Sequence, residues 1–498
     1  MKFNIKKYYL LIISSLLIFS GCSEFLEEPD KSNFTNENYF TKPEHAESAV
    51  NSIYQDLQPV LVSGFGGGPW MMTEFATGLA NTELGQAQNS IFVRNLNNNS
   101  DNGYGQTYWT SYYRGIANAN LAIAKIPGIP MNEVAKKKSL GEARFLRALY
   151  YFELVRIFGS VPLITEPVGL ASKDLYPSPA SVENIYKVIE GDLLEAEKSG
   201  LAARDASGRV SIGAVKSLLS SVYLTMAGFP LNKPENFAKA AEKALDVMNS
   251  NQFSLFTSYD DLHLPSRKNS IENIFQVQYL ENIIPSSLQT AIIPYNQGIS
   301  NYNAETGAIF ANKEFVESYE KGDKRAAEKQ FYYTSYTLKS NRSLSKNLGG
   351  YYIFKHFDVV AQTSTTSSGL NWTILRYPEV LLNYAEAANE VSGPTPAILN
   401  AVNLIRKRAE LPELTGLTKA ELREAIWRER WYELSFENKT WYDMVRLRKA
   451  FNVFTKKFEP YVGHKFSYGP TLAEKELLFP IPTAEIRNNN KLKQNPGY

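Results

Sequence analysis

Helical spacing of apolar residues dominates the middle of the chain. In residues 133–159, apolar side chains recur at intervals of three and four positions, as at Phe145 and Leu149, and this spacing predicts a helix. The same kind of pattern predicts helices over residues 109–126 and 181–200. The sequence therefore predicts a largely helical protein.

Two pairs of predicted helices share one layout. Residues 213–228 precede residues 236–250, and residues 376–391 precede residues 397–411. In each pair, a Leu-Leu step leads into small residues, and an Ala-rich partner helix follows a short connection. Small residues let antiparallel helices approach closely, as in tetratricopeptide repeats. Residues 109–159 are predicted to supply a third pair, so the fold class is predicted to be mainly α, with tetratricopeptide-like helical pairs.

The pattern changes between residues 251 and 374. The stretches at 273–280 and 351–360 predict short strands, and the residues around them are rich in Asn, Ser, Thr, Gly and Tyr. Residues 81–107, rich in Asn, Gln and Gly, predict a long surface loop. Irregular loops on a rigid helical scaffold are typical of a binding region.

The N-terminus has the layout of a secretory signal. Three lysines precede a short apolar stretch at residues 10–19, and Ser20 and Gly21 come directly before Cys22, the only cysteine of the chain. The apolar stretch is shorter than the ~18–20 residues that a membrane-spanning helix needs. Small residues before a cysteine resemble the lipobox of bacterial lipoproteins, although Phe19 stands where leucine is usual. We expect lipidation of Cys22; the alternative is an ordinary signal with a chance cysteine.

Composition excludes several classes of protein. One cysteine allows neither a disulfide framework nor a cysteine-based zinc cluster. Removal of residues 1–21 takes away three lysines and no acidic residue, which changes the formal charge from +2 to −1. A near-neutral chain lacks the basic footprint of a nucleic-acid-binding protein.

The motifs of several enzyme classes are missing from the sequence. The four histidines are scattered without metal-ligand spacing, the Gly-rich stretch at 64–70 lacks the Gly-Lys-Ser/Thr of a phosphate loop, and no GxSxG elbow occurs. A carboxylate pair of a glycoside hydrolase can lie anywhere in a sequence, so this alternative stays open. We expect a binding protein with no catalytic residue.

Residues 422–451 alternate charged and aromatic side chains. Glu429 and Glu433 are one helical turn apart, as are Glu433 and Glu437, and tryptophans such as Trp431 lie between them. This pattern predicts a helix with an aromatic face and an ion-paired face. We interpret the segment as structural; the alternative is a ligand groove.

Several motifs resemble one known family. The stretches "RYPEVLLNYAEAANE" (376–390), "RERWYELSFENKTWYDMVRLRKA" (428–450) and "LLFPIPTAEIRNNNKLKQNPGY" (477–498) are similar to hallmark motifs of the SusD/RagB family of nutrient-binding surface lipoproteins. The resemblance extends from Cys22 to Tyr498. It implies four tetratricopeptide-like pairs and an irregular ligand-binding part.

The resemblance also implies a function and a location. Members capture glycans, or peptides in some cases, without catalysis, and deliver them to a SusC-like TonB-dependent transporter, on which they sit as a lid. We therefore expect an outer-membrane lipoprotein that faces the cell exterior. Its partners are then the transporter and a glycan or peptide. A pure tetratricopeptide scaffold, which would bind only a protein partner, is a further alternative.

The domain organisation follows from the resemblance. We expect a signal peptide at 1–21 and a single SusD-like domain at 22–498. Its helical scaffold should comprise mainly 35–60, 109–250 and 375–450, and its loop-rich ligand-binding part mainly 61–108 and 251–374.

The family motifs belong to the scaffold, so the binding residues are chosen by chemistry. Stacking a sugar ring needs an exposed, rigid aromatic ring with amide or charged side chains nearby. We expect no metal and no cofactor other than the lipid on Cys22. The loops offer these candidates for ligand binding: Phe65, Trp70, Tyr104, Tyr295, Asn296, Tyr302 and Trp372.

Overall fold

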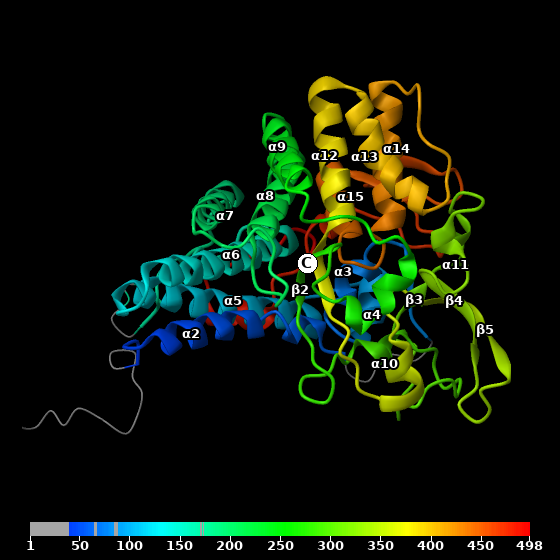
Figure 1. The fold of residues 1–498 in the computed structure, drawn as a ribbon, viewed down its shortest axis with the longest axis horizontal. Helices are drawn as coiled ribbons and strands as arrows, with labels where there is room; N and C mark the ends of the chain where they lie inside the picture. Colours follow the sequence, from blue (N-terminus) through cyan, green and yellow to red (C-terminus); the bar gives the residue numbers. More distant parts are fainter. Residues whose placement is uncertain (1–38, 64–66, 84–87, 170–171, 173) are drawn as a thin grey trace, which may run out of the picture.

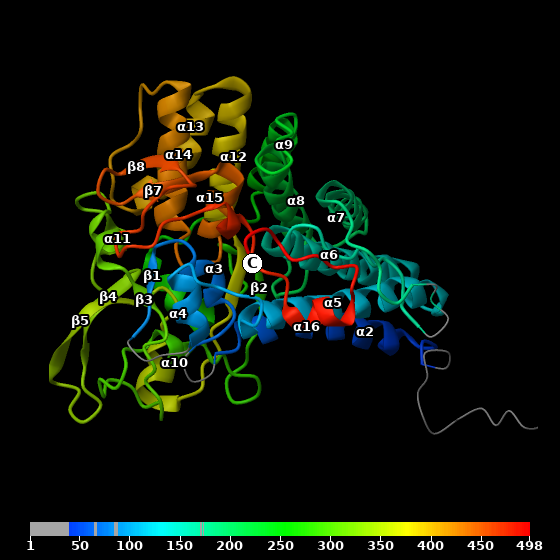
Figure 2. The same ribbon diagram turned by 180° about the vertical axis from the view of Figure 1, so that it is seen from behind.

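The structure is a computed structural model that describes residues 39–63, 67–83, 88–169, 172 and 174–498. An arc of helices and a loop-rich part with short strands lie side by side (Figures 1 and 2). Within these ranges, no helix has both the length and the apolar character needed to cross a membrane.

The first half of the arc is a stack of four helices. These are α2 (Pro43–Gln55), α5 (Gly103–Lys125), α6 (Glu133–Phe158) and α7 (Val182–Glu197). Each packs against the next along the chain. The predicted helices of this region are therefore confirmed.

Local capping fixes where these helices begin. The side chain of Asn132 accepts hydrogen bonds from the backbone N–H groups of Val134 and Ala135 at the start of α6. Ser181 accepts one from the N–H of Asn184 at the start of α7. Such caps satisfy backbone donors that have no partner inside the helix.

The second half of the arc contains α8 (Ile212–Ala227), α9 (Asn236–Asn249), α12 (Tyr377–Ser392), α13 (Pro396–Arg408) and α14 (Lys419–Glu433). Helix α8 packs against α9, α9 against α12, and α12 against α13 and α14. The two predicted helical pairs are thus present, and α9 joins them directly.

Two small sheets and a hairpin form the strand content of the described residues. Strands β2 (Asn273–Val277) and β6 (Trp372–Arg376) pair antiparallel, with Val277 opposite Trp372. All five β2 residues are buried. A second sheet has the order β1-β3-β5-β4, and a hairpin joins β7 to β8. Their bounds are Ala80–Asn81 (β1), Phe310–Ala311 (β3), Tyr332–Thr337 (β4), Ser345–Ile353 (β5), Lys449–Asn452 (β7) and Lys457–Pro460 (β8).

Three local predictions need correction. The strand expected at 351–360 ends at Ile353, because the chain turns there. The strand expected at 273–280 ends at Val277, and the loop expected at 81–107 contains α4 (Gln88–Arg94). Short helices also occur at α3 (Met71–Phe75), α10 (Leu288–Ile292), α11 (Lys313–Glu317), α15 (Thr440–Leu447) and α16 (Thr483–Asn488). Single helical turns lie at Pro59–Leu61, Ile126–Gly128, Tyr259–His263, Pro265–Arg267, Lys324–Ala326, Ala361–Thr365 (η7) and Glu474–Leu477 (η8).

The predicted helix over 422–451 is two helices and a strand. Helix α14 ends at Glu433 and α15 begins at Thr440. Between them, Phe436 and Asn438 have positive φ angles of 59° and 56°, which no α-helix allows. The interruption separates α15 from α14, and the aromatic residues on both sides, such as Trp431 and Trp441, lie in the core.

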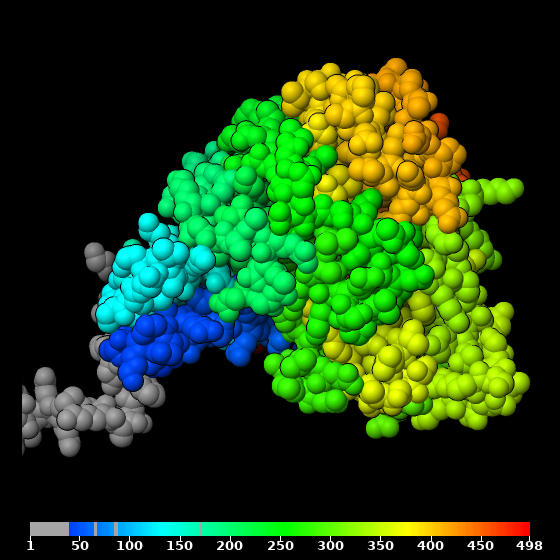
Figure 3. Space-filling model, viewed as in Figure 1, coloured from blue at the N-terminus to red at the C-terminus, as the bar shows by residue number. Residues whose placement is uncertain are grey.

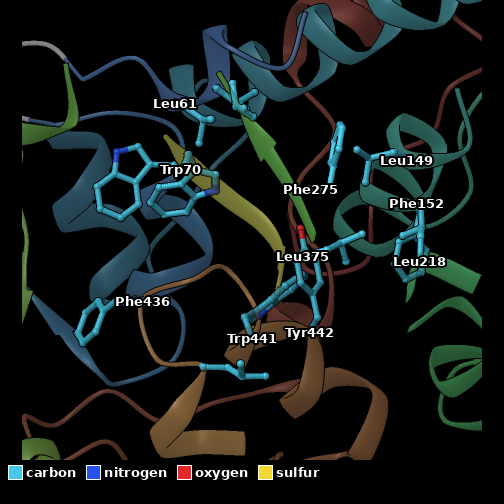
Figure 4. Packing of buried hydrophobic residues seen from close by; sticks show 14 of the residues in the cluster. Leu61, Trp70, Leu149, Phe152, Leu218, Phe275, Leu375, Phe436, Trp441 and Tyr442 are labelled. Atoms are coloured by element: carbon cyan, nitrogen blue, oxygen red, sulfur yellow. The ribbon is translucent and has the colours of Figure 1, made fainter. Parts of the chain in front are cut away.

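One core joins the arc to the loop-rich part (Figure 4). Leu149 and Phe152 of α6 and Phe275 of β2 approach Tyr442 of α15, and Trp70 belongs to the same buried cluster. Residues more than 350 positions apart thus share one interior, which holds the surface loops on a rigid base.

Candidate functional site

A buried ion cluster lies where α14 meets β6. The carboxylate of Glu433, whose side chain is 0% exposed, accepts hydrogen bonds from Arg376 (2.6 Å), Arg408 (2.7 Å) and Arg325 (3.2 Å). Burial alone would raise the pKa of Glu433, but the three guanidinium charges hold it well below its usual range.

The neighbouring Glu437 is held in the same way. It accepts two hydrogen bonds from Arg376 and pairs with Lys355. Burial opposes ionisation of Glu437, but these two cations lower its pKa to about 2. A buried carboxylate whose oxygens are already paired with cations is not accessible to a ligand. The charged face of 422–451 is therefore structural.

Trp70 and Trp372 do not lie on the surface, which corrects their selection as exposed platforms. Trp70 is 0% exposed, and its ring centroid is 5.2 Å from that of Trp372, which is also buried. The indole N–H of Trp70 donates to Ser63 Oγ at 3.1 Å. The backbone N–H of Trp70 donates to the carbonyl of Val60, which turns the side chain inward.

Tyr104 is likewise buried rather than exposed. It lies in the first turn of α5, and its hydroxyl is 2.9 Å from Ser90 Oγ. That hydroxyl also lies 2.9 Å from where a Cβ on Gly67 would stand, and Gly67 has a φ of +125°. Tyr104 therefore packs closely against Gly67. Phe65 and Cys22 lie outside the described residues.

The segment 294–307 carries the one candidate ring that is well exposed among the described residues. Tyr295 is 45% exposed, and Asn296 beside it is exposed with a φ of +50°. The carboxylate of Glu305 accepts hydrogen bonds from the N–H groups of Gly298 (2.5 Å) and Ile299 (2.7 Å). It also accepts one from Ser300, so the loop after Tyr295 is rigid.

Neighbouring segments fix this loop from two sides. The side chain of Asn301 donates to the carbonyl of Thr363 in η7 at 2.7 Å. Arg342, at the tip of the β4–β5 hairpin, donates to the carbonyl of Ile299 at 2.6 Å and to Asn301 Oδ1 at 3.2 Å. The ring of Tyr295 is therefore presented by a preformed loop.

Tyr302 lies at the edge of this loop and is half-buried. Its ring packs against the core, and its hydroxyl is buried without a hydrogen-bond partner. Burial, and then the charge of Asp358, raise the pKa of Tyr302. Only part of its ring edge faces solvent.

Exposed aliphatic side chains, which the sequence analysis did not select, lie on segments that are linked to this loop or to one another. The turn at 280–286 contacts 367–369, since the N–H of Ser286 donates to the carbonyl of Ser368. In the sequence, the two adjacent isoleucines Ile283 and Ile284 in an otherwise polar stretch are the signal that could have indicated this surface. We call the exposed parts of 280–286, 295–303, 338–344 and 359–360 the loop-end surface. Its exposed apolar side chains are Leu280, Ile283, Ile284, Tyr295, Leu344, Val359 and Val360.

The loop-end surface lies along the lower side of the loop-rich part in the view of Figure 3, opposite α13 and α14. It offers one aromatic face, aliphatic side chains and the exposed amides of Asn296 and Asn303. Such a surface can stack a ring and bind hydroxyl or peptide groups. Within the described part of the chain, no group of three or more His, Cys, Asp or Glu residues is placed to hold a metal ion.

Two histidines, the buried His263 and the partly buried His356, lie outside the loop-end surface. Burial lowers the pKa of His263 and of His356 to about 4, so both are neutral near pH 7. His356 bonds to the carbonyl of Phe436 at 2.8 Å and stacks near Trp372. These histidines are part of the core packing.

Two family models match this chain. The model described as "SusD family" matches residues 289–498, and the model described as "Starch-binding associating with outer membrane" matches residues 24–224. The "SusD-like protein P2" of Formosa agariphila is 28% identical, over 99% of this chain and 100% of that protein.

Solved structures match the whole fold. A surface glycan-binding protein A from Bacteroides thetaiotaomicron, solved in complex with laminarihexaose, is 21% identical with a TM-score of 0.73, and the match covers 91% of this chain and 100% of that one. A SusD superfamily protein from Parabacteroides distasonis is 39% identical with a TM-score of 0.89, and the match covers 94% of this chain and 100% of that one. The chain therefore belongs to the SusD/RagB family.

Proposed function

We propose that this protein is a non-catalytic glycan-binding protein and that it holds oligosaccharide on the loop-end surface. The observation that carries the proposal is the ring of Tyr295, which is exposed on a loop held by Glu305 and Arg342. Solved relatives described as binding laminarin or laminarihexaose support a glycan as the ligand.

The binding mechanism is equilibrium stacking. A sugar ring lies on the face of Tyr295, and the amide of Asn296 exchanges hydrogen bonds with its hydroxyls. Because Glu305 already fixes the loop, little conformational entropy is lost on binding. The half-buried ring of Tyr302 borders the site, whereas Trp70 and Trp372 are buried and do not stack on the ligand.

We also propose how the protein is placed in the cell. Cleavage before Cys22 removes the signal peptide at 1–21, the cysteine receives lipid, and residues 22–498 act as a single domain on the outer surface of the outer membrane. A SusC-like TonB-dependent transporter is the proposed partner that receives the glycan. Membership of the SusD/RagB family and the outer-membrane wording of the N-terminal family model support this assignment.

The test compares two exposed tyrosines on different loops. Tyr295→Ala should weaken binding of the best glycan from a panel by about tenfold, because it removes a stacking interaction. Tyr176→Ala removes a ring that is 53% exposed on a distant loop and should leave the affinity unchanged. Calorimetric titration measures both. Equal affinity of Tyr295→Ala and wild type would reject the site.

Two other outcomes would reject the function itself. Release of new reducing ends from a bound polysaccharide would show an enzyme. Failure of every glycan in the panel to bind, together with tight binding of a peptide, would favour peptide capture. The exposed aliphatic side chains of Ile283 and Val360 on the loop-end surface are the specific observation that favours this second candidate.

A further inference from the structure

A large apolar cavity is lined by residues of the helical arc and of the C-terminal segment. Figure 2 shows the C-terminal segment beside α6 and α15. The empty volume of the cavity is about 1190 Å³, part of which is open to solvent. The end of α6, the start of α7, the loop after α8, α15 and the C-terminal segment enclose it. It shares no lining residue with the loop-end surface. Its apolar walls include Val155, Val182, Phe229, Val445, Leu477 and Leu478.

Three of the four cations in the lining are neutralised by carboxylates. The ion pairs are Arg156–Glu153 (2.5 Å), Arg446–Glu386 (2.6 Å) and Lys475–Glu476 (3.3 Å). The rings of Phe152 and Tyr442 also lie 3.7 Å and 3.6 Å from the guanidinium carbon of Arg156. These three cations have little charge left for a ligand.

Arg448 is the exception among these lining residues. Its guanidinium donates to the carbonyl of Val445 at 3.1 Å and lies 5.2 Å from the ring centroid of Phe229, but it forms no ion pair with a described carboxylate. Glu474, the one acid in the lining, is close enough to influence Arg448 electrostatically and lies beyond ion-pair distance. Among the described residues, the hydrogen bond of the Arg448 guanidinium is the one from Nη1 to Val445, and Nε and Nη2 have no acceptor there.

The backbone of Arg448 has an unusual conformation for an arginine. It follows α15 with φ 53° and ψ 37°, in the left-handed region, where helices commonly end on glycine. An L-residue pays roughly 1–2 kcal/mol for this conformation. A guanidinium that binds a ligand would account for an arginine at this position.

We propose that this cavity binds a small carboxylic acid with an apolar body. The carboxylate pairs with Arg448, and the apolar body lies between the walls that carry Val182, Val445 and Leu478. The charge of Arg448 disfavours amines. The walls are mostly apolar, with polar side chains such as Ser160, Thr225 and Asn495 among them, and so favour an apolar body over a sugar. The size suits a medium-chain fatty acid or an arylalkanoic acid.

The test uses decanoate, below its micellar concentration, and the purified protein. We expect saturable one-to-one binding in calorimetry. Arg448→Met should weaken it by about tenfold or more, because a charge-assisted hydrogen bond is lost. Glu474→Gln should strengthen it, since one repulsive charge is removed. Decanol, which lacks the carboxylate, should bind wild type no better than it binds Arg448→Met.

Two cavity-filling variants locate the bound molecule. Val182→Phe and Val445→Phe each place a larger side chain in the cavity, from two different walls. Each should abolish decanoate binding, while circular dichroism shows that the protein is folded. Having two variants keeps the test valid if one does not fold. Undiminished binding in a folded filling variant, equal affinity in Arg448→Met, or no decanoate binding to wild type would each overturn the proposal. Glycan affinity should be unchanged in Arg448→Met, which separates this site from the proposed function.

Discussion

The carboxyl group of Glu74 shows how a single buried residue can make stability depend on pH. Glu74 lies in α3, and its Oε1 accepts a hydrogen bond from the N–H of Asn438 at 2.6 Å. Its Oε2 is buried and has no hydrogen-bond partner among the described residues. Burial raises the pKa of Glu74 to about 7. The folded protein therefore favours the neutral acid.

We predict that Glu74→Gln changes how stability depends on pH. Between pH 4.5 and 7 folded Glu74 binds more protons than the unfolded residue, so its contribution is complete below pH 4.5 and is lost as the pH rises through 7. Glutamine does not titrate. The variant should gain on the order of 2–3 kcal/mol relative to wild type between pH 5 and pH 8.

Chemical denaturation at the two pH values measures this difference. The depressed pKa values of Glu433 and Glu437 act in the opposite direction, but they are common to both proteins and cancel. Glu424→Gln, at an exposed position of α14, is the control and should show no such change. A pH-independent difference between wild type and Glu74→Gln would contradict the prediction.

At the scale of elements, the arc depends on close contact between neighbouring helices. A Cβ on Gly115 of α5 would lie 2.4 Å from the ring of Tyr150 on α6. A Cβ on Gly191 of α7 would have no described atom within 4 Å, apart from those of its own helix and chain neighbours. One glycine is thus needed for packing and the other is not.

We predict opposite effects for alanine at these two glycines. Gly115→Ala should destabilise the protein by about 1–3 kcal/mol, because Tyr150 must move. Gly191→Ala should stabilise it by about 0.5–1 kcal/mol, because alanine has the better helix propensity and meets open space. Thermal unfolding of both variants measures this. A stabilised Gly115→Ala would show that α5 and α6 do not approach as closely as described.

At the scale of the whole molecule, the C-terminal segment packs against the N-terminal helices. The N–H of Phe479 donates to the carbonyl of Ile157 at the end of α6, and the N–H of Thr483 donates to the carbonyl of Ser100. The C-terminal segment therefore closes the N-terminal helices. This contact also builds the cavity that contains Arg448.

The proposed anchor is tested on the whole molecule in cells. Cys22→Ala should move the protein from the membrane fraction to the soluble fraction, because lipid attachment needs the thiol. Ser20→Ala, which keeps a small residue before the cysteine, should stay with the membrane. Fractionation with immunodetection compares the two. Membrane retention of Cys22→Ala would contradict the anchor.

The helices of the arc and their pairing could be predicted from the sequence. Their signals, such as apolar spacing in α6 and the cap at Ser181, lie within a few turns of one helix. The interruption at Phe436 could not be found in this way, since the residues on either side continue a helical pattern. Tertiary contacts decide that position.

By itself, the sequence determined the helical pairs and the family motifs, because local periodicity and short motifs need no distant partner. The tertiary structure decided which aromatic rings meet solvent. Trp70 and Trp372 are some 300 residues apart, and their packing against each other buries both. Tyr295 stays exposed because Glu305 fixes its loop from within, while Asn301 and Arg342 fix the loop to other segments. Exposure depends on such long-range contacts, and no short stretch of sequence contains them.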